Sequence, residues 1–491
     1  MTKTPERSPT TSQVILRRIT ESADRMIAWW RGLCERYNPI VLILAAWALL
    51  VLPLVFLRGF NSDEGVAVTI ARTAIEDGYW LTPHMFNVRF IERPTLLSWT
   101  IAAISLPFGG VGQVTARLPI VLSVLGGCLL IYWLLRKVAS SPAALLGAAL
   151  FLACPIVLRG YVMTTADMPL AVLLFLAFVV WWNGYASGHG TLGRWIGIGV
   201  VLALAGLMKG PQPLGYFALG IGLFILVTRS WKQIPGFVLA GIICVIPLVA
   251  WYAHVYTPGD ANAWAAFMRF SVSAPLAGPI EAVWRLLTNT LPAALLAAAF
   301  LATNRLRGSG AASTAFVTAL VCYAFTCSIA VLFWPGGSTP RYFFPMVLPL
   351  CVLGGLAFDA LASRRPLLVA PVLAITIGIL GYALIYSVVA APLLPDRFRS
   401  AQIDGTRIAD TVRAAPGPIY RTGPTGLNDL LYVPTRVLNV TFAELETVRG
   451  PAWFAVPADE ATAILAIRKE SLHLTISFGQ SKEWRLLRLD K

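Results

Sequence analysis

The sequence predicts an α-helical protein that crosses a membrane many times and carries a small soluble α/β domain at its C-terminal end. Of its 491 residues, 57% are hydrophobic and 13% are charged, about half the charged fraction of a typical soluble domain. A soluble enzyme, a disordered chain and a fibrous protein are therefore excluded. The charge is also unevenly spread, because residues 391–491 hold 24 of the 63 charged residues. This charge-rich end is long enough for one small core.

Apolar runs divide the chain into a basic N-terminal segment (1–38), a membrane part (39–391) and a soluble end (392–491). Eleven runs are interpreted as spans, and we expect about 11–13 transmembrane helices. The runs are 39–57, 118–135, 143–160, 169–186, 195–208, 211–228, 235–255, 286–303, 312–334, 343–361 and 367–391. Residues 58–116 are too polar to cross a membrane and too long for a simple connection. They form a first outer loop.

Basic residues predict the orientation of these spans. Residues 1–38 contain seven Lys and Arg residues, with Trp29 and Trp30 near their end, which is typical of a cytoplasmic segment leading into an interfacial helix. These 38 residues before the first apolar run are too many for the basic start of a cleavable signal peptide. Alternate loops are also basic, as an N-terminus in the cytoplasm requires; they contain Arg136, Lys137, Arg194, Arg229, Lys232, Arg305, Arg307, Arg364 and Arg365. The first outer loop and residues 392–491 then lie on the far side, which is the periplasm in a bacterium.

Net charge and cysteine content exclude two further kinds of site. The net charge is +15, but no Lys/Arg-rich run or nucleic-acid motif accompanies it, so we expect no nucleic-acid partner. In a membrane protein such an excess indicates topology and contact with anionic lipid. The seven cysteines form no CxxC pair, and six lie in apolar stretches. They are interpreted as core residues rather than disulfides or metal ligands.

Residues 392–491 alternate β-type runs with helical runs, which is the pattern of a small α/β domain. The β-type runs are Pro418–Arg421, Pro451–Val456, Leu472–Phe478 and Trp484–Leu489, and the helical runs are Phe442–Val448 and Asp459–Arg468. No G-x-G-x-x-G motif lies at a junction between a strand and a helix. No nucleotide site is therefore assigned to this domain.

Two acidic motifs lie where apolar chain meets the far face. Asn61-Ser62-Asp63-Glu64 opens a helix that should run to Ile75, with Ser62 as its N-cap, and Asp167 comes just before a span. Acids in the first turn of a helix suit the helix dipole, and in a soluble protein capping would be the preferred interpretation. At the edge of a membrane, an ionisable residue is instead a candidate for function.

Several cations lie on the same far side, against the positive-inside bias. They are Arg89 and Arg93, which share the stretch Pro83–Pro94 with His84 and Glu92, together with Lys209 and Arg341, which precedes Tyr342. Cations on the far side are against the usual bias, and binding of an anionic phosphate is their common function. Several such cations together with two acids predict a site.

The motifs occur in a characteristic order over residues 61–345. They are Asn61-Ser62-Asp63-Glu64, Pro83–Pro94, Ala116-Arg117-Leu118-Pro119, Ala166-Asp167-Met168-Pro169-Leu170, Gly206-Leu207-Met208-Lys209-Gly210-Pro211 and Arg341-Tyr342-Phe343-Phe344-Pro345. In this they resemble the lipid-linked sugar transferases, a family that includes the bacterial aminoarabinose transferases acting on lipid A and the dolichyl-phosphate-mannose protein mannosyltransferases. The resemblance implies the GT-C membrane fold, a polyprenyl-phosphate-sugar donor and location in the bacterial inner membrane.

The resemblance also implies roles for individual residues. Asp63 matches the main catalytic carboxylate of the family, and Asp167 matches an acid across the same cavity. Two juxtamembrane helices are expected in the first outer loop. The chain departs from the family at Glu92-Arg93-Pro94-Thr95, where the family often has Glu-Lys-Pro-Pro. Arginine keeps the positive charge and adds a bidentate fork, so phosphate binding should survive with altered geometry.

A mechanism follows from such a donor. Transfer breaks the bond between the anomeric carbon and a phosphate oxygen, so fixed cations near the leaving phosphate stabilise the transition state. The expected phosphate-binding residues are Arg93, Lys209, Arg341 and Arg89. Asp63 is the candidate to take the proton of an acceptor hydroxyl or to stabilise positive charge on the sugar, and Glu64 and Asp167 complete the catalytic candidates. The expected substrate-positioning residues are His84, Glu92 and Tyr342. By family analogy the reaction inverts the anomeric centre.

No cofactor is required, because the donor is already activated by its lipid. A divalent metal held by Glu92 and His254, with His84 also on the outer face, is a weaker hypothesis that uses the affinity of His and carboxylate groups for such ions. The spacing of these residues is not diagnostic. A solvated histidine or a capped helix end is the favoured interpretation.

A polyprenyl-linked sugar flippase or a transporter is the main alternative, because many spans with acidic and basic residues also fit a transport pathway. The charged residues gather on one face and not at mid-bilayer, and no internal repeat is evident, which favours a transferase. The expected acceptor is lipid A, another glycolipid or a polysaccharide, and the expected state of the protein is a monomer in the lipid bilayer. The identity of the sugar is left open.

Overall fold

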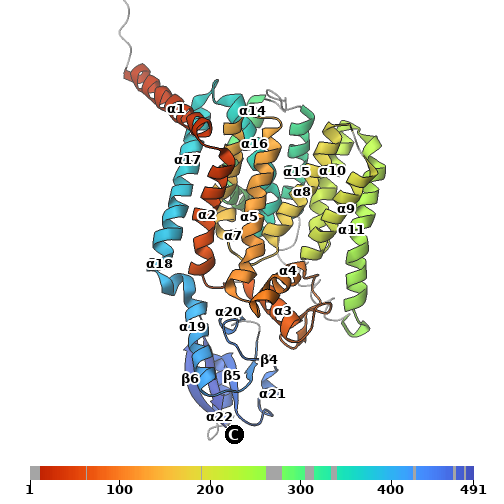
Figure 1. Ribbon diagram of the computed structural model, residues 1–491, viewed down its shortest axis with the longest axis vertical. Coiled ribbons are helices and arrows are strands. Elements are labelled where there is room, and N and C mark those ends of the chain that lie inside the picture. The colour runs from red at the N-terminus through yellow and green to blue at the C-terminus, as the bar shows by residue number, and fades with distance from the viewer. Residues whose placement is uncertain are drawn as a thin grey trace, which may run out of the picture.

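The computed structural model of the chain describes residues 11–61, 63–188, 191–260, 279–304, 314–332, 340–423, 427–467, 472–479 and 483–490. Long helices run side by side to form a bundle, and a small α/β domain lies beyond one end of it (Figure 1). The N-terminal helix α1 (Thr11–Arg36) lies at the opposite end (Figure 1). The predicted fold class, a polytopic helical membrane protein with a small C-terminal α/β domain, is confirmed.

All eleven predicted spans coincide with helices or helix pairs within these residues. Among the residues that the structure describes, seven helical segments are long and apolar enough to cross a membrane. They contain α2 (Pro39–Leu57), α5 (Gln113–Arg136), α8 (Asp167–Ala186), α9 (Leu192–Lys209), α11 (Ile234–Val255), α16 (Phe344–Leu361) and α17 (Pro366–Ile385). The consecutive helices α13 (Pro279–Thr290) and α14 (Ala293–Asn304) form an eighth candidate, bent by 105°. The other three predicted spans coincide with the apolar helices α6 (Ser141–Ala153), α10 (Gln212–Thr228) and α15 (Thr314–Leu332). The basic residues Arg305 and Arg307 lie outside the described residues.

The predicted span 143–160 is divided by a proline. Helix α6 ends at Ala153, and Pro155 begins the short helix α7 (Pro155–Gly160). A proline has no N–H with which to continue the helical hydrogen-bond ladder, but it is well suited to the first position of a new helix. The break turns the chain at the end of the bundle and brings Arg159 to the region of the candidate site.

Helix α16 forms the centre of the bundle, where it packs against α6, α8, α14 and α15. Nearly all of its residues are buried. Gly355 makes the approach to α6 possible, because a Cβ atom there would lie 2.8 Å from the backbone carbonyl oxygen of Ala143. Small residues at such contacts let membrane helices approach closely.

The first outer loop forms two helices and a hairpin at the end of the bundle nearest the α/β domain (Figure 1). The helices are α3 (Glu64–Glu76) and α4 (Leu96–Ser105), and the hairpin pairs β1 (His84–Met85) with β2 (Val88–Arg89). Helix α3 follows the predicted course to within a residue at its end. Its predicted N-cap, Ser62, lies outside the described residues.

The C-terminal domain contains a mixed five-stranded sheet with the strand order β4-β3-β5-β7-β6. The three strands β4, β3 and β5 are parallel, and β7 and β6 are antiparallel to their neighbours. The strands are β3 (Ile419–Arg421), β4 (Val437–Asn439), β5 (Ala452–Pro457), β6 (Leu472–Phe478) and β7 (Trp484–Leu489). The helices are α19 (Pro395–Ala414), α20 (Leu427–Leu430), α21 (Phe442–Leu445) and α22 (Ala458–Ile467). The sequence predicted all of these strands except β4.

The C-terminal domain is joined to the first outer loop by specific contacts. Phe86, at the tip of the hairpin, is buried in the core of the domain, and the guanidinium carbon of Arg421 lies 5.3 Å from its ring centre. Asn87 and Asn439 form two hydrogen bonds of 2.9 and 2.7 Å through side chain and backbone. The Tyr432 hydroxyl accepts the backbone N–H of Phe60 at 2.9 Å. The domain therefore braces the loop that carries Asp63, where the sequence predicted a separate domain.

A buried carboxyl group should make the stability of this domain depend on pH. Burial, and to a lesser extent the carboxylate of Asp404, raises the pKa of Asp429 from its ordinary value of 3.8 to about 7. Between pH 3.8 and about pH 7, the Asp429 carboxyl group is protonated in the folded domain but ionised in the unfolded chain. The stability present at low pH is therefore lost as the pH rises from about 4 to about 7.

We expect Asp429→Asn, which stays neutral, to melt several degrees above wild type at pH 8 and close to wild type at pH 4. Thermal melting of the purified full-length protein in detergent at the two pH values measures this. Asp410→Asn, an exposed acid on α19 paired with Arg413, is the matched control and should leave both curves unchanged. Identical melting of Asp429→Asn and wild type at pH 8 would contradict the assignment.

Candidate active site

Four charged residues that are far apart in the sequence meet at the end of the bundle nearest the C-terminal domain. Arg341 Nη1 forms an ion pair with Asp63 Oδ2, and its Nε lies 4.0 Å from Asp167 Oδ2. Lys209 Nζ forms a second ion pair with Asp167 Oδ1. Arg341 thus links the two acids, and the predicted set of Asp63, Asp167, Lys209 and Arg341 is one network.

Secondary structure positions each member of this network. Asp63 immediately precedes α3, and Asp167 is the first residue of α8. Lys209 is the last residue of α9, and Arg341 lies in the short helix η4 (Pro340–Phe343) that leads into α16. Acids at helix N-termini and a cation at a helix C-terminus are favoured by the helix dipole. Turns at the ends of four separate elements therefore converge.

The two ion pairs differ in their access to water. The Asp167 and Lys209 side chains are only 5% and 8% exposed, whereas those of Asp63 and Arg341 are 47% and 28% exposed. Lys209 Nζ also lies 4.3 Å from the ring centre of Tyr342, a cation–π contact that helps to hold the ammonium group. Asp63 is therefore the carboxylate of the network that a substrate can reach.

Two cavities meet at the pair formed by Asp63 and Arg341. The first, of about 50 Å³, is lined by both residues and by Arg93, Asp167 and Lys209, and we call it the polar cavity. The second, of about 300 Å³, also borders Asp63 and Arg341, and we call it the junction cavity. Its other walls are mostly apolar and include Ile156, Met163, Met168 and Phe344. A ligand in either cavity could contact the Asp63 carboxylate.

Hydrogen-bond donors remain available to a ligand in the polar cavity. The Arg341 Nε is buried and has no hydrogen-bond partner within the described part of the chain. Arg93 Nη1 forms an ion pair with the adjacent Glu92 at 2.8 Å, and both side chains are about one-third exposed. A guanidinium group has five N–H donors, so Arg93 and Arg341 can each bind an anion while keeping the acid they already contact.

Glu64 lies outside the cavities and has a different role from the one that the sequence suggested. Its side chain is completely buried. One carboxylate oxygen accepts the backbone N–H of Thr164 and the other that of Asn61, both at 2.8 Å. Arg117, which is also fully buried, lies 3.8 Å away. Both oxygens are therefore used inside the protein, where Glu64 ties the turn that contains Asp63 to the segment before α8.

Two further residues predicted for the site lie elsewhere. Arg89 forms an ion pair with Asp260 at 3.2 Å and donates to the carbonyl of Val255, so it ties the hairpin to the end of α11. His84 stacks on Tyr79 with ring centres 3.8 Å apart. Both residues follow the C-terminal end of α3, whereas Asp63 precedes its N-terminal end. Neither residue lines the cavities that contain Asp63. In this structure both residues make contacts within the outer loop and with the end of α11, and their roles in binding phosphate and substrate stay predictions.

The metal hypothesis concerns Glu92 and His254, both of which lie within the described residues. Within the described residues, no three His, Cys, Asp or Glu side chains lie close enough to hold a metal ion. Glu92 is paired with Arg93, and His254 is exposed on α11. The metal assigned to Glu92 and His254 stays an untested hypothesis.

Arg58 and Arg159 are two functional candidates that were not predicted from the sequence. Arg159 lines the junction cavity, and Arg58 lies at the end of α2 with its Nη1 3.3 Å from the Arg159 carbonyl oxygen. The signal was present, because both are cations at the far-side ends of predicted spans, as Lys209 is. Arg58 directly follows the predicted span 39–57, and Arg159 lies inside the run 143–160.

The bundle, the outer helices and the C-terminal domain together define a multi-span membrane protein of the GT-C fold. The crystal structure of ArnT from Cupriavidus metallidurans bound to undecaprenyl phosphate superposes on the chain with a TM-score of 0.73 and 18% identity, and covers 91% of this chain and 97% of that one. The structure of the same protein in the apo state gives a TM-score of 0.72. The fold implied by the motifs is therefore confirmed.

Sequence comparison confirms the resemblance to lipid-linked sugar transferases. A family model described as dolichyl-phosphate-mannose-protein mannosyltransferase matches residues 92–254. The undecaprenyl phosphate-alpha-4-amino-4-deoxy-L-arabinose arabinosyl transferase of Enterobacter sp. (strain 638) is 26% identical over 231 residues, which are 46% of this chain and 42% of that protein. The enzyme of the same name from Pseudomonas paraeruginosa (strain DSM 24068 / PA7) is 24% identical over 316 residues, 62% of this chain and 57% of that protein. The chain thus matches about half of the length of these relatives.

Proposed function

We propose that the protein is a membrane glycosyltransferase that moves a sugar from a polyprenyl-phosphate donor to a cell-envelope acceptor, with inversion at the anomeric carbon. The observation that carries the proposal is the position of the Asp63 carboxylate between two cavities, held by Arg341, which also contacts Asp167. Such an arrangement lets one carboxylate face both a donor and an acceptor. The similarity to transferases named for an undecaprenyl-phosphate donor supports the choice of reaction.

The donor phosphate would bind in the polar cavity. Arg93 and Lys209 line this cavity together with Arg341, and each has more N–H donors than the described part of the chain uses. When the bond between the anomeric carbon and the phosphate oxygen breaks, the bonding electrons go to that oxygen, and the phosphate gains negative charge. Fixed cations in a site of low polarity stabilise this charge without reorganising. The buried Arg341 Nε, which has no hydrogen-bond partner in the described part of the chain, is well placed to do so.

The acceptor would approach Asp63 from the junction cavity, on the side away from the donor phosphate. In an inverting displacement the acceptor oxygen bonds to the anomeric carbon as the phosphate leaves from the opposite face. A hydroxyl acceptor gives its proton to the Asp63 carboxylate, which acts as general base. An acceptor that is itself an ionised phosphate needs no such transfer, and Asp63 then positions the sugar and stabilises its positive charge.

The proposed orientation places this site in the periplasm and the N-terminus in the cytoplasm. Arg31 on α1 donates a hydrogen bond of 3.2 Å to Ser363, so α1 lies at the same end of the bundle as Arg364 and Arg365. Arg136 ends α5, and α1 packs against the next helix, α6. This end of the bundle is basic, as the cytoplasmic side of a bacterial inner-membrane protein should be. We propose a monomer.

Mass spectrometry of the cell envelope tests the proposed function and names the sugar. A strain that lacks the gene should lose one glycosylated species, and the missing mass gives both the sugar and the acceptor. Wild-type protein supplied from a plasmid should restore the species, whereas Asp63→Asn should not. An envelope with no missing glycan, or full restoration by Asp63→Asn, would contradict the proposal.

A further inference from the structure

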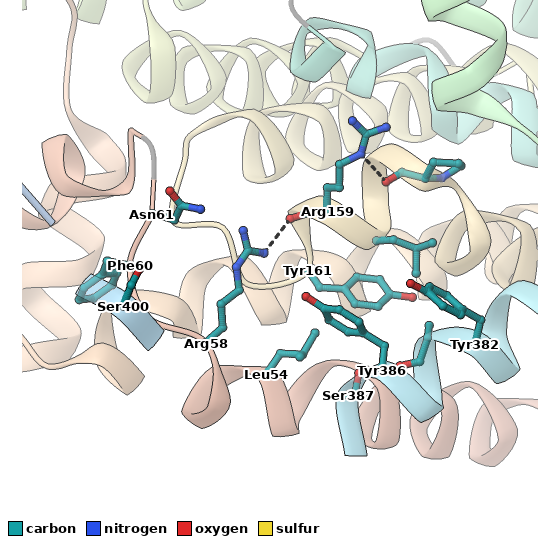
Figure 2. A pocket seen from close by; sticks show the side chains of 13 residues that line it. Leu54, Arg58, Phe60, Asn61, Arg159, Tyr161, Tyr382, Tyr386, Ser387 and Ser400 are labelled. Atoms are coloured by element: carbon teal, nitrogen blue, oxygen red, sulfur yellow. Dashed lines mark hydrogen bonds between the residues drawn. The ribbon is translucent and has the colours of Figure 1, made fainter. Parts of the chain in front are cut away.

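A short connection, residues 58–61, leads from the end of α2 toward Asp63, and we call it the strap. It borders a third cavity, of about 450 Å³, which shares Arg159 with the junction cavity. Figure 2 shows three side chains of the strap among those that line this cavity, namely Arg58, Phe60 and Asn61. Within the described residues, the Asp63 side chain makes no capping hydrogen bond to α3. The position of the Asp63 carboxylate therefore depends on the strap that precedes it.

The start of α5 holds the carbonyl groups of the strap. Arg117, whose side chain is completely buried, donates to the carbonyl of Arg58 and, at 2.9 Å, to the carbonyl of Gly59. Gln113 Nε2 donates to the Arg58 carbonyl at 2.9 Å and to the Val55 carbonyl at 2.8 Å. These contacts fix the last turn of α2 and the first half of the strap to the helical bundle.

Tyr432, which belongs to the C-terminal domain, holds the second half of the strap. Its hydroxyl oxygen accepts the backbone N–H of Phe60 at 2.9 Å, and its hydroxyl hydrogen is donated to Gln113 Oε1 at 3.1 Å. The ring centres of Tyr432 and Phe60 lie 5.5 Å apart. Burial raises the pKa of Tyr432 to about 12. The hydroxyl therefore keeps its proton at neutral pH and can form both hydrogen bonds at once.

The position of Tyr432 is itself fixed from two sides. Gly405 on α19 packs so closely that a Cβ atom there would clash with the Asp429 carbonyl oxygen and lie 2.8 Å from Tyr432 Cβ. Arg72 Nη1, on α3, donates to the Val433 carbonyl at 2.8 Å. Residues 429–433 are therefore held between α19 of the C-terminal domain and α3 of the outer loop. A hydroxyl group supported in this way can hold the strap in one geometry.

We propose that Tyr432 is a positioning residue for sugar transfer, whose hydroxyl holds the strap so that the Asp63 carboxylate faces both cavities. This inference rests on the proposed transferase function and gives the C-terminal domain a part in the reaction. The cations assigned to the donor phosphate come from other segments, because Arg93 precedes α4, Lys209 ends α9 and Arg341 precedes α16. Loss of the hydroxyl should therefore misplace the carboxylate in the transition state and leave ground-state binding of the donor intact.

Tyr432→Phe tests this inference, because it removes both hydrogen bonds and keeps the ring on Phe60. Tyr420→Phe is the matched control, since Tyr420 lies on β3 of the same domain with its ring centre 6.2 Å from that of Phe454. Asn87→Ala is the second control, because it removes two hydrogen bonds between the domain and the hairpin, outside the strap.

Two measurements are made on each full-length protein. Initial rates at several concentrations of undecaprenyl phosphate carrying a labelled sugar, with a known amount of protein in membranes, give kcat and KM. Hydrogen exchange of the peptide that contains Phe60 reports on the strap without reference to activity. Thermal melting of the purified proteins verifies folding.

Tyr432→Phe should lower kcat about tenfold and leave the KM for the donor within about twofold of wild type. The Phe60 amide should exchange about tenfold faster, because it loses its hydrogen-bond acceptor. The melting temperature should fall by no more than about 3 °C, so that the lower rate is not a loss of folded protein. Tyr420→Phe and Asn87→Ala should keep the wild-type kcat and the wild-type exchange at Phe60.

An unchanged kcat or unchanged exchange at Phe60 in Tyr432→Phe would overturn the inference. An equal loss of kcat in Asn87→Ala would also overturn it, by showing a general effect of domain docking. A raised KM with an unchanged kcat would place Tyr432 in substrate binding instead. A wild-type protein that transfers no sugar contradicts the proposed function, and exchange at Phe60 then still decides whether Tyr432 holds the strap, so the two failures are distinguishable.

Discussion

Replacement of Asp63 by asparagine should reduce the rate of sugar transfer by about 10²–10⁴-fold, the contribution of a positioned acid or base. Asparagine has nearly the same volume, but it carries no negative charge and cannot accept the proton of the acceptor. Because the donor phosphate is assigned to Arg93, Lys209 and Arg341, the variant should still bind undecaprenyl phosphate within about threefold of wild type. Initial rates with a radiolabelled lipid-linked sugar in membranes measure the first effect, and equilibrium binding measures the second.

The matched control for this variant is Asp77→Asn. Asp77 lies at the other end of α3, and within the described residues it forms an ion pair with Arg436 alone, at 3.6 Å. It should leave transfer unchanged. Normal transfer by Asp63→Asn would remove Asp63 from the reaction, and equal losses in the two variants would show a general effect on α3.

Replacement of Lys209 by methionine should both destabilise the protein and slow transfer. The Asp167 carboxylate is almost completely buried, and after this change its one remaining cationic partner among the described residues is Arg341, at 4.0 Å. Removing one member of a buried ion pair costs about 3 kcal/mol, which should lower the melting temperature by several degrees. Loss of one cation beside the leaving phosphate should also reduce transfer about 10²-fold.

A double variant separates the two effects. Asp167→Asn combined with Lys209→Met removes the unpaired charge, so it should recover most of the melting temperature that Lys209→Met loses. It should not recover transfer, since the cation is still missing. Thermal melting and initial rates on the same four proteins measure both quantities. A double variant that melts at or below the temperature of Lys209→Met would contradict the buried ion pair.

Much of the fold could be predicted because its signals are local. Each span is an apolar run, and the strands of the C-terminal domain alternate with helices along the sequence. What could not be predicted depends on contacts between distant segments. Phe86 belongs to the core of the C-terminal domain, although it is more than 300 residues away from that domain in the chain. Strand β4 has only three residues, and pairing with β3 defines it.

In the candidate site, too, some residues could be predicted from the sequence and others could not. Asp63, Asp167, Lys209 and Arg341 stood out as charges in an apolar chain, and the structure brings all four together. Glu64 could not be distinguished from Asp63, because the two are adjacent and only the direction of each side chain decides which one faces the cavity. One residue of helix is about 100° of rotation. Glu64 points into the protein, where it binds the backbone of Asn61 and Thr164.

The central claim is that sugar leaves a polyprenyl phosphate at this site, and product formation by the purified protein tests it most directly. Wild-type protein in vesicles receives a polyprenyl-phosphate donor labelled in the sugar and, separately, in the lipid, together with bisphosphorylated lipid A. Transferase action predicts that one free polyprenyl phosphate appears for each sugar joined to the acceptor, and that neither product forms with Asp63→Asn. Movement of intact lipid-linked sugar across the vesicle membrane, with no polyprenyl phosphate released, would contradict the claim and indicate a flippase.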